Sequence, residues 1–266
     1  MNSSFVDLPF GGRDVRIEVA WVGPETPGRP PLVFLHEGLG SVAMWRDFPA
    51  RLCTALGCRG LVYSRPGYGR STPRPAGEVW APDYLHAQAL DLLPALLERL
   101  DIRGPYVLFG HSDGGSISLI HAARFPRRVA AAVVLAPHIH VEPVALAGIR
   151  AARAAYLATD EMRRRLARYH DDVDSAFFAW NDAWLAPAFE SWNIEALLDG
   201  IRCPLLAIQG AEDEYGTMAQ IDGIAARVPG TTLLKLDDCG HVPHRDRPLE
   251  VIEAVRALLA GLATPG

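Results

Sequence analysis

The sequence predicts an α/β fold in which a mostly parallel central sheet is flanked by helices on both faces. Three observations support this fold class. Short apolar runs that favour strands alternate along the chain with helical patterns. The interval 141–200 shows helical patterns without a convincing strand, which predicts a helical cap inserted into the alternation. The hydrophobic content of 49% over 266 residues is ample for a large core.

In the first half of the chain, strand, loop and helix follow one another repeatedly. Residues 15–22 alternate apolar and polar side chains, which predicts an antiparallel strand. Helical spacing at 84–100 predicts a helix that Pro94 kinks, because proline lacks an amide hydrogen. The remaining elements expected here are buried strands at 32–35, 60–63, 106–109 and 129–135, a helix at 45–56 and a helix that ends near Pro126.

The second half begins with the expected cap and then returns to the alternation. Within the cap, helical segments are expected at 145–158 and 161–170, followed by a tryptophan-rich stretch at 176–192. The chain therefore divides into a core of residues 1–140 and 201–266 and a cap of residues 141–200, with reactive groups expected at the strand ends beneath the cap. The elements expected after the cap are strands at 204–209 and 231–236 and helices at 218–228 and 249–262.

The composition of the chain indicates which kind of partner it binds. The net charge of -5 is mild and both signs are mixed, so no nucleic-acid footprint is present. The sequence contains no run of about 18 apolar residues, and its first ten residues lack a basic region followed by a long apolar core. These features predict a cytoplasmic protein without a membrane partner. The four cysteines show no paired spacing and are expected to be reduced, buried thiols. A small molecule is the expected partner, and nothing indicates the oligomeric state.

The stretch 110–114, Gly-His-Ser-Asp-Gly, lies between an expected strand and an expected helix. This G-x-S-x-G pattern is typical of a nucleophile elbow, where glycines on both sides of the serine allow a strained turn that exposes its hydroxyl. The simpler interpretation is that small residues let a helix start close to a strand. The strand before and the helix after favour Ser112 as a nucleophile.

The chain resembles the α/β-hydrolase family from His36 to His241, nearly its whole length. The resemblance implies the α/β-hydrolase fold with a helical cap, a serine nucleophile and no dissociable cofactor. It rests on four matched sites, which are the loop 36–40 (His-Glu-Gly-Leu-Gly), the elbow 110–114, the loop 210–213 (Gly-Ala-Glu-Asp) and the loop 239–241 (Cys-Gly-His).

A serine hydroxyl is a weak nucleophile at neutral pH, so a histidine must accept its proton and a carboxylate must orient that histidine. The family's order of serine, acid and histidine is matched by Ser112, Asp213 and His241, each of which directly follows an expected strand. Glu212 and Glu214 compete for the acid role and His244 for the base. We expect both glutamates to be solvated and His244 to bond locally or to face solvent.

The resemblance further implies two backbone N–H donors for the oxyanion, those of Asp113 and Gly38, with Leu39 as a substitute for Gly38. Many relatives have His-Gly where this chain has His36 and Glu37. Because a carboxylate would repel the developing negative charge, we expect the Glu37 side chain to turn away and to be hydrogen-bonded.

Asp113 has two interpretations. Gly-x-Ser-Asp-Gly-Gly resembles the elbow of valacyclovir-hydrolase-like enzymes, in which the acidic residue recognises an amino group of the substrate. The alternative, which we favour, is that the Asp113 carboxylate caps the elbow helix near its positive N-terminal end.

The candidate substrate-binding residues are Glu37, Leu39, His138, Trp180 and Trp184. The aromatic residues of the cap either line an apolar acyl pocket or form the core of the cap. A metal site is not expected, because neither histidine pair has a third ligand at a recognisable spacing. The histidine pairs in question are His138/His140 and His241/His244, and the other aromatic residues of the cap are Phe177, Phe178 and Trp192. The run Arg163–Arg165 is either solvated or meets an anionic substrate. The roles of Arg65, Tyr68 and Arg70 are open.

Together these observations predict a serine hydrolase that cleaves a small carboxylic ester, thioester or lactone through an acyl-enzyme on Ser112, without a cofactor. The same triad would also serve a hydrolase of carbon–carbon bonds in vinylogous diketones, and that alternative stays open. A non-catalytic ligand-binding module is disfavoured, because a receptor has no need for all three triad residues.

Overall fold

The computed structural model describes residues 2–261, which are built around an eight-stranded sheet. The strand order is β1-β2-β4-β3-β5-β6-β7-β8, and all pairs from β4 to β8 are parallel, whereas β2 pairs antiparallel with β1 and with β4. The strands are β1 (Ser4–Phe10), β2 (Arg13–Val22), β3 (Leu32–Leu35), β4 (Gly60–Tyr63), β5 (Tyr106–His111), β6 (Val129–Leu135), β7 (Leu205–Gly210) and β8 (Thr232–Leu236).

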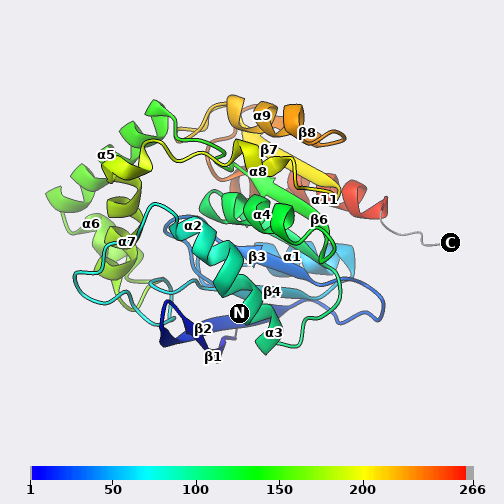
Figure 1. The fold of residues 1–266 in the computed structure, drawn as a ribbon, viewed down its shortest axis with the longest axis horizontal. Helices are drawn as coiled ribbons and strands as arrows, with labels where there is room; N and C mark the ends of the chain where they lie inside the picture. The colour runs from blue at the N-terminus through cyan, green and yellow to red at the C-terminus, as the bar shows by residue number, and fades with distance from the viewer. Residues whose placement is uncertain (1, 262–266) are drawn as a thin grey trace.

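The helices of the core follow the strands and cover both faces of the sheet (Figure 1). The predicted end of the last helix at residue 262 lies outside the described residues. The core helices are α1 (Phe48–Leu56), α2 (Tyr84–Ala87), η1 (Gln88–Leu92), α3 (Leu93–Arg99), α4 (Asp113–Arg124), α9 (Ala219–Arg227), α10 (Pro243–Asp246) and α11 (Pro248–Ala260).

Two hydrophobic clusters hold these layers together, one on each face of the sheet. Along β3, Val33 and Leu35 join the cluster that contains α3 and α4, whereas Leu32 and Phe34 join the cluster that contains α1 and α11. This alternation follows from the two-residue period of a strand. Because both faces are covered, every residue of β3 is buried, which explains why its sequence is a continuous apolar run.

The strand bounds predicted at 32–35, 60–63 and 129–135 are confirmed. The edge strand β1 was not predicted, because it alternates too weakly and contains Pro9, a residue that a sheet tolerates mainly at an edge. The predicted helix at 45–56 begins only at Phe48, since Pro49 is favourable in a first helical turn and disruptive further inside.

The predicted kink at Pro94 takes the form of a wider helical turn. The segment from α2 to α3 is continuous, and its middle part, η1, is a π-helix that ends just before Leu93 and Pro94. Proline cannot donate to the carbonyl four residues earlier, and π-turns are one way in which a helix accommodates such a break.

The segment between β6 and β7 is helical, as predicted for residues 141–200. Its helices α5 to α7 lie together beyond one end of the sheet in Figure 1. In the described residues of this segment the extended pairing is limited to one bridge between His140 and Asn193. Whether the segment is a separate cap domain stays a prediction. Its elements are α5 (Pro143–Ala158), α6 (Glu161–Leu166), α7 (Val173–Leu185), η2 (Pro187–Phe189) and α8 (Glu195–Leu198).

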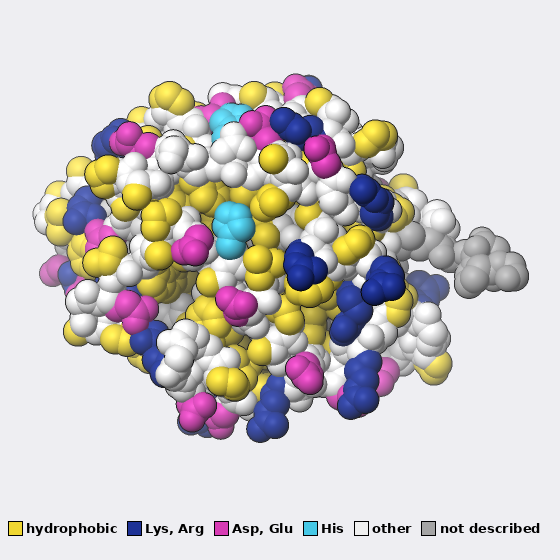
Figure 2. All heavy atoms as spheres, viewed as in Figure 1, with side chains coloured by type: hydrophobic (Ala, Val, Ile, Leu, Met, Phe, Trp, Pro, Cys, Tyr) yellow, Lys and Arg dark blue, Asp and Glu magenta, His cyan; other side chains and the backbone are white. Residues whose placement is uncertain are grey.

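Other expectations from composition can be compared with the structure. All four cysteines are free and buried, as predicted. None of the described helices is both long and apolar enough to cross a membrane. On the face shown in Figure 2, acidic and basic side chains are both present, and hydrophobic side chains are visible in its recesses.

Candidate active site

Ser112 lies at a sharp turn between β5 and α4. Its backbone has φ 52° and ψ -118°, an unusual conformation for a residue with a side chain. The flanking glycines are required by close contacts. A Cβ at Gly110 would lie 2.2 Å from the carbonyl oxygen of Gly114, and a Cβ at Gly114 would lie 2.0 Å from that of Leu35. The turn therefore fits a nucleophile elbow and presents the Ser112 side chain at the end of β5.

The structure brings Ser112, His241 and Asp213 into one hydrogen-bonded chain. The His241 Nε2 atom is 3.0 Å from the Ser112 hydroxyl oxygen. The His241 Nδ1 atom is 2.8 and 2.9 Å from the two carboxylate oxygens of Asp213. Asp213 lies in the loop after β7 and His241 in the loop after β8, so the three residues meet because parallel strands end at the same edge of the sheet.

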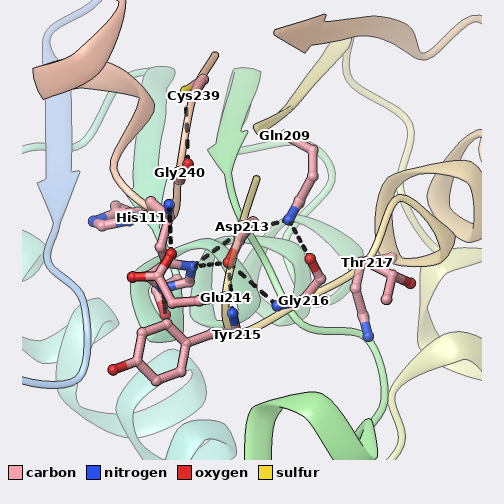
Figure 3. Close-up of polar contacts among 12 residues, drawn as sticks. His111, Gln209, Asp213, Glu214, Tyr215, Gly216, Thr217, Cys239 and Gly240 are labelled. Carbon is pink, nitrogen blue, oxygen red and sulfur yellow. Dashed lines mark hydrogen bonds and ion pairs between the residues drawn. The ribbon is translucent and has the colours of Figure 1, made fainter. Parts of the chain in front are cut away.

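The Asp213 carboxylate is held by several donors besides His241. Gln209 Nε2 donates to it at 2.6 Å, and the backbone N–H groups of Tyr215 and Gly216 donate at 2.8 and 3.2 Å. Figure 3 shows these contacts converging on Asp213. Burial pushes the pKa of Asp213 upward, but the hydrogen bond and the charge of His241 outweigh burial, so that its pKa lies below the usual value. Asp213 is therefore an anion that orients the imidazole.

The competing residues occupy different places. Glu212 and Glu214 are exposed, as expected, although a Glu214 oxygen accepts a hydrogen bond from the backbone N–H of His241 at 3.3 Å. His244 is buried, with its ring 4.7 Å from that of Trp45, and burial lowers its pKa well below the usual value. The prediction that His244 bonds locally or faces solvent is therefore wrong, because the ring packs in an aromatic cluster.

The two predicted oxyanion donors are both free. In residues 2–261, neither the Gly38 N–H nor the Asp113 N–H forms a hydrogen bond. Gly38 also allows the indole of Trp180 to approach closely, since a Cβ at Gly38 would lie 2.2 Å from that ring. The Asp113 N–H is unpaired because it belongs to the first residue of α4, where no carbonyl precedes it in the helix.

The side chain of Asp113 fits the two interpretations from the sequence only in part. It lies in the first turn of α4, where a negative charge is favourable, but its carboxylate makes no capping hydrogen bond to the helix. It is fully buried, with one carboxylate oxygen 2.9 Å from the Tyr84 hydroxyl and 3.3 Å from Arg65 Nη2, and the other 3.1 Å from Trp184 Nε1. A substrate amine could reach this carboxylate only by displacing one of its buried partners, of which Trp184 lines the cavity, so the geometry does not favour amine recognition.

A cavity of about 110 Å³ opens beside Ser112 and His241. Two further lining residues, Ile149 and Tyr215, were not identified from the sequence. Tyr215 follows Asp213 by two positions, a signal that was available, whereas Ile149 is one of many apolar residues in α5. Two larger hollows elsewhere have no histidine in their walls. The predicted substrate-binding residues all line this cavity, namely Glu37, Leu39, His138, Trp180 and Trp184.

Glu37 and His138 are the polar side chains of the cavity besides the triad. A Glu37 carboxylate oxygen lies 3.4 Å from His111 Nδ1, a contact that is a hydrogen bond when this nitrogen carries a proton, and the Glu37 side chain lines the cavity rather than turning away. Burial raises the pKa of Glu37, but contacts with His111 outweigh burial and hold it well below the usual value. His138 is 3% exposed, its Nδ1 atom has no partner, and burial lowers its pKa to about 3. Near neutral pH the cavity therefore contains a carboxylate and a neutral imidazole.

The remaining candidates lie away from the cavity. Phe177 stacks on Tyr156 with ring centroids 3.8 Å apart, which places it in the core of the inserted segment. Arg163 pairs with Asp174 at the surface. Among the described residues, no group of three or more His, Cys, Asp or Glu side chains is placed to hold a metal ion.

Known proteins provide an independent comparison. A model of the alpha/beta hydrolase family matches residues 32–254. A pimeloyl-(acyl-carrier protein) methyl ester esterase of Aromatoleum aromaticum is 28% identical over 266 residues, which cover 88% of this chain and 99% of that protein. A 2-succinyl-6-hydroxy-2,4-cyclohexadiene-1-carboxylate synthase of Salmonella agona is 24% identical, with 89% and 96% covered.

A solved structure supports the same fold. A thermophilic esterase from Thermogutta terrifontis superimposes with a TM-score of 0.72 at 21% identity and covers 99% of this chain and 100% of its own. The fold class predicted from the sequence is therefore confirmed.

Proposed function

The chain belongs to the alpha/beta hydrolase family, and on that premise we propose that it is a serine hydrolase acting on a small carboxylic ester, thioester or lactone. The observation that carries this proposal is the hydrogen-bonded chain from Ser112 through His241 to Asp213. Each link has the polarity that acyl transfer needs, because the serine O–H can donate to Nε2 while Nδ1–H donates to the carboxylate.

The geometry supports the following reaction. His241 Nε2 accepts the Ser112 proton as the hydroxyl oxygen attacks the substrate carbonyl carbon, and the resulting oxyanion accepts bonds from the N–H groups of Gly38 and Asp113. His241 then donates the proton to the leaving oxygen or sulfur, which leaves an acyl group on Ser112. A water molecule activated by His241 repeats the sequence and releases the acid. Asp213 stays ionised throughout and stabilises the imidazolium.

The cavity supports a small substrate without a negative charge near the scissile bond. Its volume of about 110 Å³ leaves room for a short acyl or alkyl group, and Leu39, Ile149 and Trp180 make its walls largely apolar. The Glu37 carboxylate faces the same space and would repel an anionic substituent. Esters of short, uncharged acids fit these constraints best.

The relatives support ester hydrolysis as the first substrate class to examine, since one bears the name of a methyl ester esterase and a structural neighbour that of an esterase. Another relative is named as a synthase, so the substrate panel has to extend beyond esters. A cytoplasmic location stays a proposal.

Turnover of p-nitrophenyl acetate, with Ser112→Ala as the control, tests the proposal. We expect release of p-nitrophenol by the wild type and a fall to the uncatalysed rate in the variant, with unchanged folding. A panel of short-chain and long-chain esters, thioesters, lactones and vinylogous diketones then ranks the substrate classes. Equal rates for the wild type and Ser112→Ala across that panel would contradict the proposal.

A further inference from the structure

A fully buried arginine lies beside the nucleophile and belongs to none of the catalytic roles above. Arg65 follows β4 in the chain, and its side chain is 0% exposed. A buried guanidinium is stable only when its donors are paired, because burial removes its hydration. Its two Nη atoms reach two places, whereas its Nε atom has no hydrogen-bond partner among the described residues. Nη2 donates to the backbone carbonyl of Glu37 at 2.9 Å, and both Nη atoms lie 3.3 to 3.4 Å from the Asp113 carboxylate.

The first contact helps to hold the direction of the Gly38 N–H, together with the backbone N–H of Gly40, which donates to the same carbonyl at 3.0 Å. The Glu37 carbonyl and the Gly38 N–H belong to one planar peptide unit, in which the C=O and the N–H point in opposite directions. A donor that holds the carbonyl therefore also holds the N–H on the other side. A rotated peptide would turn the N–H away from the oxyanion and place a carbonyl oxygen there instead. Donation by a cation also polarises the peptide and strengthens the N–H as a donor.

His36 holds the same carbonyl and depends on Arg65 for its tautomer. The backbone N–H of Arg65 donates to His36 Nε2 at 2.9 Å, so this nitrogen must be the unprotonated one. The proton of the neutral ring is then on Nδ1, which donates to the Glu37 carbonyl at 2.7 Å. Burial and the charge of Arg65 lower the pKa of His36 well below its usual value, which keeps the ring neutral.

The second contact anchors the residue that supplies the other donor. The Asp113 carboxylate is held by Arg65, Tyr84 and Trp184, and the N–H of the same residue is the second oxyanion donor. One guanidinium thus links the peptide that contains the Gly38 N–H to the residue that contains the Asp113 N–H. Gly38 and Asp113 lie 75 residues apart in the chain, and no hydrogen bond joins them directly.

We propose that Arg65 is a positioning residue of the oxyanion hole, which holds the Glu37–Gly38 peptide in its productive orientation and ties it to Asp113. The inference rests on the proposed serine-hydrolase function. It goes beyond charge balance, because an ion pair with Asp113 would need no contact with the Glu37 carbonyl. Substrate does not touch Arg65, so its loss should affect the transition state more than the binding of substrate.

The test separates positioning from charge balance. Arg65→Met alone would leave the Asp113 charge buried and unpaired, which threatens folding. The double variant Arg65→Met/Asp113→Asn removes both charges together. Asp113→Asn alone is its comparator, because the amide oxygen of asparagine can still accept a hydrogen bond from Arg65, which also keeps its contact with the Glu37 carbonyl. Glu18→Gln is the matched control for loss of a buried charge away from the site, since Glu18 is 2% exposed and bonds to Ser64 and Ser3. Each protein is assayed for kcat and KM with p-nitrophenyl acetate, for inhibition by phenylboronic acid and for its thermal unfolding midpoint.

We expect the double variant to fold and to have a kcat roughly 10-fold to 100-fold below that of Asp113→Asn, with KM changed less than about 3-fold, since losing one oxyanion donor outright costs about 100-fold or more. The inhibition constant for phenylboronic acid, whose adduct places an oxygen in the oxyanion hole, should rise by a similar factor. Glu18→Gln should lose stability but not kcat. A kcat and boronate affinity equal to those of Asp113→Asn, or a loss confined to KM, would overturn the inference.

If the double variant does not fold, Arg65→Lys tests whether Arg65 positions the oxyanion hole. Lysine keeps a cation near Asp113 but lacks the planar fork that reaches two acceptors at once. We expect its kcat and boronate affinity to fall together, and wild-type values for both would contradict the role of Arg65. A wild type without any Ser112-dependent turnover would instead contradict the proposed function, so the two failures are distinguishable.

Discussion

Two hydrogen-bond networks meet at Ser112, and they differ in burial and in composition. The proton-transfer network contains His241 and Asp213, and the His241 side chain keeps 11% of its surface exposed. The oxyanion network contains Arg65 and Asp113, and both side chains are fully buried. In the proposed mechanism the histidine exchanges protons with serine, leaving group and water, so it needs access to the cavity. The oxyanion donors only have to keep their positions.

This difference in burial fits the different roles that we propose for the two networks within one site. An ion pair that is excluded from water is strongly destabilised when one partner is lost, so the oxyanion network resists rearrangement. The carboxylate of Asp213 is instead held mainly by neutral donors, which leave its charge available to the imidazole. Substitutions that alter one network and leave the other intact should therefore have different effects.

Asp213→Asn alters the proton-transfer network most directly. The amide can donate to Nδ1 of His241, which favours the tautomer whose Nε2 carries a proton and cannot accept one from Ser112. We expect kcat to fall by about 10³-fold to 10⁴-fold with the fold retained, as expected for a histidine in the wrong tautomer. Steady-state kinetics with p-nitrophenyl acetate and the circular dichroism spectrum check this result. A loss of less than about 10-fold would exclude Asp213 as the orienting acid.

Gln209→Leu removes a single donor from Asp213, the bond of 2.6 Å from Nε2. The carboxylate keeps its other partners, so we expect a fall in kcat of roughly 10-fold, the equivalent of about 1.4 kcal/mol in the barrier. Gln88→Leu is the matched control, because Gln88 is also a buried glutamine but lies outside the cavity. Kinetics that do not distinguish the two variants would show that Asp213 needs no support from Gln209.

Acid should destabilise the protein through its buried neutral histidines. Burial lowers the pKa of His138 to about 3, whereas an unfolded histidine titrates near 6.5. Below about pH 6.5 the unfolded chain therefore binds a proton that folded His138 does not, and stability falls as the pH falls. His36 acts in the same direction within the oxyanion network, because its pKa is also lowered.

The contribution of His138 can be isolated by urea unfolding at pH 7.5 and pH 5.5. Between these pH values the wild type should lose about 1.4 kcal/mol more stability than His138→Asn, because an unfolded histidine takes up its proton midway through this range, near pH 6.5. Equal losses in the two proteins would mean that folded His138 becomes protonated in this range.

Trp184→Phe weakens the oxyanion network by one hydrogen bond, the donation of 3.1 Å from Nε1 to Asp113. We expect a loss of about 1 to 2 kcal/mol in unfolding free energy and a fall in kcat of about 2-fold to 5-fold. Trp192→Phe is the matched control, since the Nε1 atom of Trp192 is buried without a partner and the residue does not line the cavity. Calorimetry and steady-state kinetics of the pair measure both effects, and a larger loss in Trp192→Phe would contradict the assignment.

The two networks also differ in how far the sequence predicts them. Ser112, Asp213 and His241 each follow a strand, and the ends of parallel strands converge, so their meeting was predictable from the order of elements. The buried strands, such as 32–35 and 129–135, were predictable because apolar runs covered on both faces have clear limits. The edge strand β1 lacks such a run, and the pairing of its residues with β2 could not be inferred from local pattern.

The pairing of Arg65 with Asp113 had no such signal. Arginine in a glycine-rich loop is usually solvated, and nothing in a local pattern links two residues 48 positions apart. The burial of both charges depends on the packing of Tyr84 from α2 and Trp184 from α7, two helices whose relative position is a tertiary property. His244 was misplaced for a similar reason, because its aromatic neighbours Trp45 and Phe48 come from a distant part of the chain.

The most direct test of the central assignment is the site of covalent labelling by a fluorophosphonate. Intact-mass spectrometry followed by peptide mapping should find a single adduct on Ser112 in the wild type, no adduct in Ser112→Ala and much slower labelling in His241→Ala. Active protein that acquires no adduct, or acquires one on a residue other than Ser112, would contradict the account.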